Sequence, residues 1–237
     1  MMIGEILFQH VHLLFIIILL SFRAACGHSS HAKYGRIRCL EREREALLKF
    51  KDELVDEYGR LSSWGSHEDK KDCCTWKGVI CHNQTNHVIV LDLQGPSDYH
   101  YTYPSTACLR GNISPWLLEL RHLNCLDLSF NDFNGSRIPN FIGSLSRLQH
   151  LDLSFSNLRG QIPHHLGNLS ELQFLSVSDN PMLTSRNLDW LSRLPLLSHL
   201  DLMYVNLTFA TDWLQTMSKL TRLHHLSMGI LSLTSGR

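Results

Sequence analysis

The stretch LSRLQHLDLSFSNLRGQIPHHLGNLSELQFLSVSDN, residues 145–180, contains the pattern that decides the fold. Leucine first recurs at every third position, in Leu145, Leu148 and Leu151, and then at the alternate position Leu153. A spacing of three suits a short helical or irregular turn, whereas alternation is typical of a β-strand with one buried face. The same succession returns 24 residues later, so this stretch predicts a repeated turn-and-strand unit.

The three-residue phrase at 151–153 occurs six times along the chain. Its copies begin at Leu91, Leu126, Leu151, Leu175, Leu200 and Leu226, with intervals of 35, 25, 24, 25 and 26 residues. The long interval contains the polar insertion SDYHYTYPSTAC. A period of this length with an LxxLxL core is a leucine-rich repeat. We therefore predict an α/β leucine-rich-repeat solenoid over residues 83–237, with parallel strands on the concave face, about five repeats, an incomplete last repeat and no C-terminal cap.

An asparagine after each strand would satisfy backbone groups at the turn. Asn131 and Asn180 occupy this position, while Ser156 and Val205 replace it. Valine cannot form such hydrogen bonds, and each unpaired buried amide costs about 1–3 kcal/mol. We therefore expect the regularity of the repeats to decay toward the end of the chain.

Composition excludes some classes of function. The 237 residues carry 22 Lys plus Arg and 22 Asp plus Glu, and this balance argues against nucleic acid as a partner. Although His, Asp and Ser are abundant, none lies in a nucleophile elbow or a paired-carboxylate motif. We expect a protein that is not an enzyme and that needs no cofactor.

The amino terminus predicts secretion. Residues 13–22 read LLFIIILLSF, which is too short to span a bilayer but suits the apolar core of a signal peptide. Small residues follow at 24–27, so we assign residues 1–27 to the signal peptide. No other stretch is apolar enough to span a membrane, and we expect a secreted, extracellular chain in the cell-wall space. Sequons for N-glycosylation occur at Asn83, Asn112, Asn134, Asn168 and Asn206.

A small cap is predicted between the signal peptide and the repeats, over residues 38–82. Apolar residues at helical spacing predict a helix from Glu41 to Tyr58, with Gly59 as its C-cap. The segment CCTWKGVIC, residues 73–81, follows a polar loop. Such a cap has too small a core to stand alone, so disulfides and a packed neighbour should stabilise it.

These motifs resemble the extracellular part of plant leucine-rich-repeat receptor-like proteins, the class that includes receptors for a fungal xylanase and Cf-type resistance proteins. The resemblance is carried by CLEREREALLKFK (39–51), LSSW (61–64) and CCTWKGVIC (73–81), and by the repeat motif LRGQIP (158–163). It implies a plant-type N-terminal cap with disulfides Cys39–Cys73 and Cys74–Cys81. The four other cysteine-state alternatives stay open: Cys108 and Cys125 are either a local pair or two free thiols.

The resemblance also implies a function in plant defence. The expected partners are a protein or glycan ligand and, within a receptor, a co-receptor kinase at the plasma membrane. Receptors of this class are longer, so we interpret the chain as truncated to the cap and about five repeats. The alternatives are a secreted inhibitor or decoy of microbial cell-wall hydrolases, similar to polygalacturonase inhibitors, and a non-functional fragment.

The outward strand positions supply the candidate ligand-binding residues. Exposed aromatic side chains beside His and Asp combine contact area with hydrogen-bonding capacity. The candidates are His150, Asp152, Phe130, Phe155, His199, Asp201 and Tyr204. The alternative is that HLDLS is a strand sequence copied by duplication. We favour duplication for the Asp positions, and neither interpretation for Phe130, Phe155 and Tyr204.

The histidines do not predict a metal site. His199 and His225 would lie on strands about 4.8 Å apart. However, Phe174 separates them from His150, and no third ligand is evident in the sequence. We therefore expect no metal.

Overall fold

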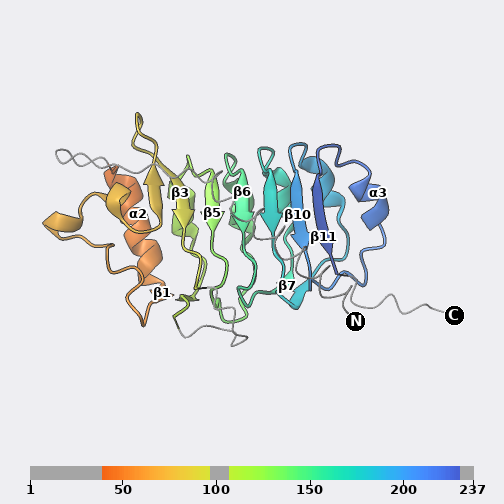
Figure 1. The fold of residues 1–237 in the computed structure, drawn as a ribbon, viewed down its shortest axis with the longest axis horizontal. Helices are drawn as coiled ribbons and strands as arrows, with labels where there is room; N and C mark the ends of the chain where they lie inside the picture. Colours follow the sequence, from red (N-terminus) through yellow and green to blue (C-terminus); the bar gives the residue numbers. More distant parts are fainter. Residues whose placement is uncertain (1–38, 97–106, 230–237) are drawn as a thin grey trace, which may run out of the picture. The chain divides into compact units, whose positions relative to one another are not determined.

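The computed structural model describes residues 39–96 and 107–229. The predicted signal peptide, most of the polar insertion and residues 230–237 lie outside the described residues. The described elements begin with a cap and continue as stacked repeats, as Figure 1 shows from α2 at one end to β11 at the other.

A seven-stranded sheet forms one layer of the repeats. Its strands are β2 (Val79–Cys81), β3 (Val88–Asp92), β5 (Cys125–Asp127), β6 (His150–Asp152), β8 (Phe174–Ser176), β10 (His199–Leu202) and β11 (His225–Met228). Their order is β11-β10-β8-β6-β5-β3-β2. Every pair from β3 to β11 is parallel, whereas β2 of the cap pairs antiparallel with β3. The predicted leucine-rich-repeat solenoid with parallel strands is confirmed.

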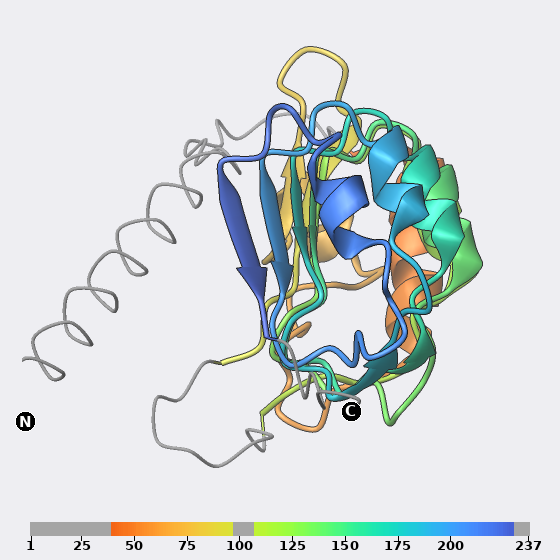
Figure 2. The same cartoon turned by 90° about the vertical axis from the view of Figure 1, so that its right-hand side faces the viewer.

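Short helices form the second layer, which faces the sheet across the core in Figure 2. They are the 3-10 helices η3 (Pro115–Glu119), η4 (Asn140–Ser144), η5 (His164–Asn168) and η6 (Asp189–Arg193), and the α-helix α3 (Trp213–Met217). Two short sheets, β1 (Leu54–Val55) with β4 (Arg110–Gly111) and β7 (Arg159–Gln161) with β9 (Met182–Thr184), lie between the strand and helix layers in sequence. Each repeat therefore makes one turn of strand, loop and short helix.

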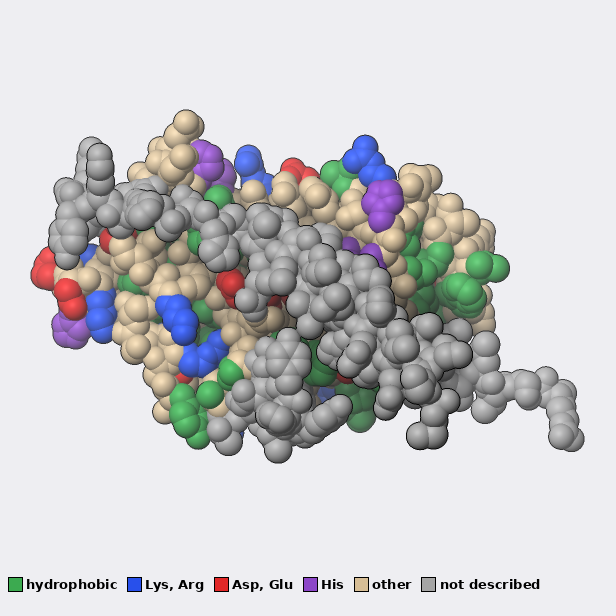
Figure 3. All heavy atoms as spheres, viewed as in Figure 1, with side chains coloured by type: hydrophobic (Ala, Val, Ile, Leu, Met, Phe, Trp, Pro, Cys, Tyr) green, Lys and Arg blue, Asp and Glu red, His purple; other side chains and the backbone are tan. Residues whose placement is uncertain are grey.

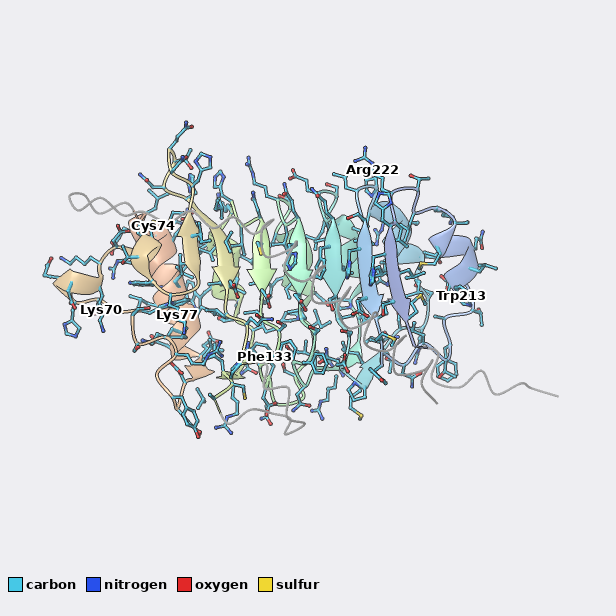
Figure 4. The ribbon with its side chains drawn as sticks, in the orientation of Figure 1. Lys70, Cys74, Lys77, Phe133, Trp213 and Arg222 are labelled. Atoms are coloured by element: carbon cyan, nitrogen blue, oxygen red, sulfur yellow. A yellow bond between two sulfur atoms is a disulfide. The ribbon has the colours of Figure 1, made fainter. Side chains whose placement is uncertain are left out.

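The repeated leucines form the core. Leu126, Leu151, Leu175 and Leu200 pair side by side across the parallel strands, and all four have no solvent-exposed surface. Burial of one such side chain contributes about 1.5–3 kcal/mol. Phe133, labelled in Figure 4, adds a buried ring below the strands. Because each leucine is covered by the repeats on either side, the core depends on stacking.

Buried polar side chains after the strands hold the turns in place. The Asn180 amide donates to the carbonyl oxygens of Leu153, Val177 and Ser178, and its Oδ1 accepts from the N–H groups of Ser156 and Leu158. Asn131 makes the equivalent bonds one turn earlier in the stack, to the carbonyls of residues 93, 128 and 129 and from the N–H of residue 109.

The turn also survives where this asparagine is replaced. The hydroxyl of Ser156 donates to the carbonyl oxygens of Leu128 and Ser154. Val205 is fully buried, and Tyr204 before it keeps a φ of 56°, close to the 53° of Asp179 one repeat earlier. The expected decay is therefore wrong at Val205, because apolar burial and the parallel register hold the turn without the amide.

The helix of the cap, α2 (Glu41–Asp52), is shorter than predicted. Its C-cap is Glu53, and the chain then pairs Leu54 with Gly111 in an antiparallel bridge. A Cβ on Gly111, whose φ is 125°, would lie 2.4 Å from the carbonyl oxygen of Glu53. The prediction of a helix to Tyr58 is wrong because this long-range pairing competes with the local helical pattern.

Two disulfides connect the cap as the resemblance implied, Cys39–Cys73 and Cys74–Cys81. Between them, the rings of Trp64 and Trp76 stack with centroids 5.2 Å apart. Figure 4 labels Cys74 at this end of the repeats, beside β2. Disulfides of this kind persist in oxidising compartments and fit an extracellular location.

Cys108 and Cys125 do not pair with each other. Cys108 is a buried free thiol, whereas Cys125 is disulfide-bonded. Both alternatives left open by the sequence, a local pair and two free thiols, are therefore wrong.

A buried arginine joins the cap to the repeats. The Arg60 guanidinium donates to Oδ1 of Asn131 over 2.9 Å and to the carbonyl oxygen of Leu93 over 3.1 Å. Burial lowers the pKa of Arg60 from its ordinary value. On the same side of the junction, buried Glu43 of α2 accepts from the N–H of Val88. The cap thus supplies hydrogen-bonding partners for the first strands.

Replacing Asn180 with alanine should destabilise the chain strongly. The substitution leaves two N–H groups and three carbonyls at a buried turn without their side-chain partner. We expect the free energy of unfolding to fall by about 2–4 kcal/mol in urea denaturation. Asn187→Ala, at an exposed position, is the control and should change it by less than about 0.5 kcal/mol. Equal effects of the two substitutions would contradict this account of the turn.

Candidate ligand-binding face

Three rows of side chains cross the strands on the outward positions of the sheet. The ring row is Cys125, His150, Phe174, His199 and His225; the acid row is Asp92, Asp127, Asp152, Ser176, Asp201 and Ser227; the turn row is Phe130, Phe155, Asp179 and Tyr204. Strand register aligns the ring row and the acid row residue by residue. The structure therefore brings all seven sequence-predicted candidates onto these three rows, and their role in binding stays a prediction.

The carboxylates of the acid row are held in one orientation. Asp127 Oδ1 accepts from the N–H and the hydroxyl of Ser129, at 2.9 and 2.6 Å. Asp152 Oδ1 accepts from Ser154 over the same two distances. Such bonds from a residue two positions on form an Asx-turn, which fixes the side chain against its own backbone. The second oxygen, Oδ2, makes no hydrogen bond with any described residue in either aspartate.

The electrostatics of the acid row favour the protonated form of its carboxyls. Burial raises the pKa of Asp127 well above its usual range, and the neighbouring charge of Asp152 raises it further. Burial likewise raises the pKa of Asp152 to about 6, although the hydrogen bonds from Ser154 act in the opposite direction. Burial and the charge of Asp201 raise the pKa of Asp179 in the turn row to about 6.

The side chains of the ring row stack on one another. The His150 and Phe174 rings lie 4.1 Å apart, Phe174 and His199 4.3 Å, and His199 and His225 4.1 Å, with interplanar angles of 15° or less. These spacings follow from the separation of neighbouring strands, about 4.8 Å. Burial lowers the pKa of His150 to about 4 and that of His199 to about 3, so both imidazoles are neutral at pH 7.

The turn row adopts a backbone conformation that the sequence did not indicate. Phe130, Phe155, Asp179 and Tyr204 have φ values of 54°, 50°, 53° and 56°. The N–H groups of Phe130 and Phe155 donate to the carbonyls of Ser154 and Ser178 in the next repeat, which extends the ladder past the strands. The left-handed turn orders these side chains: the Phe130 and Phe155 rings stack at 4.6 Å, and Tyr204 is 51% exposed.

Two groups of described residues have the donor atoms of a metal site. Cys39, Cys73 and Cys74 form one, but their sulfurs are in the two disulfides. Asp127, His150 and Asp152 form the other, and one ligand atom from each lies within 4.8 Å of the others. Sequence reasoning considered only His199 and His225 and missed this group, because its members come from two strands and two rows. The repeat register, which places 127 beside 152, is the signal that could have found it.

The predicted glycosylation sites lie off the three rows. Asn83, Asn112, Asn134 and Asn168 are exposed in the β2–β3 loop, after β4, in the turn after β5 and at the end of η5. Asn206 is half-buried, and its Oδ1 accepts from the N–H and the hydroxyl of Thr208 in its own sequon. None of the five sequons lies on a strand of the seven-stranded sheet, so glycans at these positions would leave the strand face accessible.

An apolar patch near α3 was also missed. Phe209 is 71% exposed, Leu214 66% and Trp213 37%. Figure 3 shows hydrophobic side chains at the corresponding end of the view, and Figure 4 labels Trp213 there, far from Cys74. These residues lie between two copies of the leucine pattern, where sequence periodicity gave no reason to separate exposed from buried positions.

Comparison with known proteins identifies the class. Residues 40–82 match the model of the leucine rich repeat N-terminal domain, and residues 122–145 and 147–169 match the leucine rich repeat model. The chain is thus a leucine-rich-repeat protein with an N-terminal cap domain. No helix among the described residues is long and apolar enough to cross a membrane.

Its relatives are plant receptors. Over 147 residues, 60% of this chain and 14% of the relative, it is 49% identical to receptor-like protein EIX2 of Solanum lycopersicum. Over 194 residues, 80% of this chain and 18% of the relative, it is 41% identical to receptor-like protein EIX1 of the same species. The chain belongs to the plant leucine-rich-repeat receptor-like proteins, and it spans less than a fifth of the length of these two relatives.

Solved structures with the same fold are plant receptor ectodomains and their complexes. One is the LRR ectodomain of the Arabidopsis thaliana membrane receptor kinase GASSHO1/SCHENGEN3 in complex with CASPARIAN STRIP INTEGRITY FACTOR 2, with a TM-score of 0.63 and 26% identity over 79% of this chain and 21% of that chain. Another is the Arabidopsis thaliana BIR3–SERK2 complex, with a TM-score of 0.61 and 30% identity over 78% of this chain and 95% of that chain.

The charge of Asp152 should weaken the fold at neutral pH. The pKa of Asp152 is raised from 3.8 to about 6, so the folded chain binds this proton more tightly than the unfolded chain. The resulting stabilisation is fully present below pH 3.8 and is lost as the pH rises through about 6. Asp152→Asn keeps an acceptor for Ser154 but cannot ionise. We expect its free energy of unfolding, minus that of the wild type, to rise by about 1–2 kcal/mol between pH 4 and pH 7 in urea denaturation.

The difference between variant and wild type is needed because His150 and His199, with lowered pKa values, change stability in the opposite direction over this range. Asp69→Asn, at an exposed position of the cap, is the control and should give a flat difference. A flat or falling difference for Asp152→Asn would show that its carboxyl is not strained in the folded chain.

Proposed function

We propose that this chain is an extracellular recognition module of a plant receptor-like protein in defence signalling, without catalysis of its own. The observation that carries the proposal is the strand face, where three rows of ordered side chains lie on a rigid sheet. Aromatic side chains beside charged ones are typical of protein-binding surfaces. The five sequons lie outside this sheet, which supports its use as a contact surface.

The relatives support the class of function. The chain resembles receptors that perceive a fungal protein, and its curated homologues are named receptor-like proteins. A structurally similar ectodomain is described in complex with a separate factor. We infer that the ligand here is a protein from outside the cell that binds the strand face.

A co-receptor kinase is the second partner we propose. The BIR3–SERK2 complex, which contains a chain of the same fold at 30% identity, supports such an association. In this arrangement the chain contributes recognition, while the co-receptor contributes the kinase.

Capture from fungal culture filtrate tests the proposal. The secreted chain is immobilised, and the bound proteins are identified and quantified by mass spectrometry. We expect one filtrate protein to be retained by the wild type and its retention to fall at least about tenfold in Phe155→Ala/Tyr204→Ala, because truncation of aromatic anchors costs about 2 kcal/mol or more. The matched control is Met182→Ala/Phe209→Ala, which removes two exposed apolar side chains away from the rows and should retain the protein.

Other outcomes point elsewhere. Equal retention by both double variants, or no specific retention by the wild type, would contradict recognition through the strand face. Inhibition of fungal polygalacturonase by the secreted chain would instead support the inhibitor alternative.

A further inference from the structure

We infer, resting on the proposed function, that the strand face binds an extended polypeptide segment with two basic residues three positions apart. The first basic side chain would lie against Asp127 and Asp152, and the second against Asp201 and Asp179. The partner is thus a basic segment of a protein, and not a glycan.

The first argument is uncompensated negative charge. Asp92, Asp127 and Asp152 are neighbours in register on three adjacent parallel strands. Like charges directly opposite each other destabilise a sheet. All ion pairs of the described residues lie elsewhere: Arg42–Glu119, Arg44–Glu41, Lys71–Glu68, His87–Glu43 and Arg110–Glu57. A cationic partner would relieve this repulsion, whereas a neutral glycan would not and an acidic glycan would increase it.

The second argument is preorganisation of the acceptors. The N–H groups of residues 94, 129, 154 and 203 fix Oδ1 of Asp92, Asp127, Asp152 and Asp201, respectively. In Asp127 and Asp152 the serine hydroxyls add a second bond to the same oxygen. The two Oδ2 atoms therefore present fixed acceptors side by side. A planar guanidinium with several N–H donors is suited to bridging two such carboxylates.

The third argument is the orientation of the rings. Phe174 is stacked between His150 and His199, and His199 between Phe174 and His225. Both faces of these two rings are therefore covered by their neighbours. A sugar that stacks on an aromatic side chain needs an open ring face, which they do not offer. Ring edges carry partial positive charge and suit the carbonyl oxygens of a polypeptide.

The fourth argument is spacing. Asp152 and Asp201 are separated by one intervening strand, β8, so they lie two strand separations, or about 10 Å, apart. An extended polypeptide advances about 3.3 Å per residue, so about three residues cover this distance. Ser176 occupies the acid row between them and removes the negative charge at the intermediate position. Two acidic pairs at this separation fit basic residues at positions i and i+3.

Fluorescence anisotropy with synthetic peptides tests the inference on the full secreted chain. The probes are fluorescein-labelled ten-residue peptides of Ser, Leu and Gly with Arg at positions 4 and 7, with citrulline at both positions, and with Arg at positions 4 and 5. Citrulline keeps the shape of arginine without its charge. We expect the first peptide to bind at least about tenfold more tightly than the citrulline peptide and severalfold more tightly than the third. Unlabelled decagalacturonate and xylohexaose, as competitors, should not displace it.

Substitutions locate the binding site. Asp127→Asn/Asp152→Asn keeps acceptors for Ser129 and Ser154 and should weaken binding of the first peptide at least about fivefold. The control Asp69→Asn/Asp189→Asn makes the same change in net charge at exposed positions away from the rows and should change binding less than about twofold. Circular dichroism verifies folding, and the single variant Asp201→Asn replaces the double variant if that one does not fold.

Several results would overturn the inference. They are no binding of the first peptide at millimolar concentration, equal binding of the citrulline peptide, equal losses in the two double variants, and displacement by either oligosaccharide. If filtrate capture still depends on Phe155 and Tyr204, these results reject the basic ligand and leave the recognition function standing. If the wild type captures no protein, the recognition function itself fails.

Discussion

The in-register stacking of parallel strands is the constraint on which the rest of this structure depends. A single repeat exposes its leucines on both sides, and only its neighbours remove them from water. The effect is visible within one row: Leu200 of β10 is fully buried between β8 and β11, whereas Leu226 of β11, the last described strand, is 42% exposed. The disulfides of the cap, the Arg60 bridge and strand β2 serve the same requirement at the other end, because they give the first repeat a covered side.

The same register determines the chemistry of the outer face. Equivalent positions of successive repeats must be neighbours at about 4.8 Å, whatever their side chains. For aromatic rings this separation favours stacking, as between Phe174 and His199. For carboxylates it imposes repulsion, as between Asp127 and Asp152. Stability obtained inside the sheet therefore creates a charged face outside it, and that charge is available to a ligand because no cation among the described residues offsets it.

Sequence periodicity predicted what depends on repetition, and it failed where long-range contacts decide. The strand register and the three rows follow from the leucine spacing alone. The end of α2 at Asp52 could not be read locally, because Leu54 is drawn into a pair with Gly111, 57 residues later. The positive φ of Phe130 and Phe155 was equally hidden, since phenylalanine is not a residue that signals a left-handed turn. The Asp127–His150–Asp152 group required distances across two strands, which letter patterns do not contain.

The departures from the repeated pattern carry more information about a ligand than the pattern itself. Duplication accounts for an aspartate in every copy of the acid row, and an unbroken row would attract cations without any preference for spacing. Ser176 interrupts the row and divides it into two acidic groups. Phe174, at the same strand, replaces histidine in the ring row and presents an apolar edge between them. One strand therefore changes a uniform charged surface into one with a defined interval, and a defined interval is what distinguishes selective recognition of a segment from general attraction to positive charge.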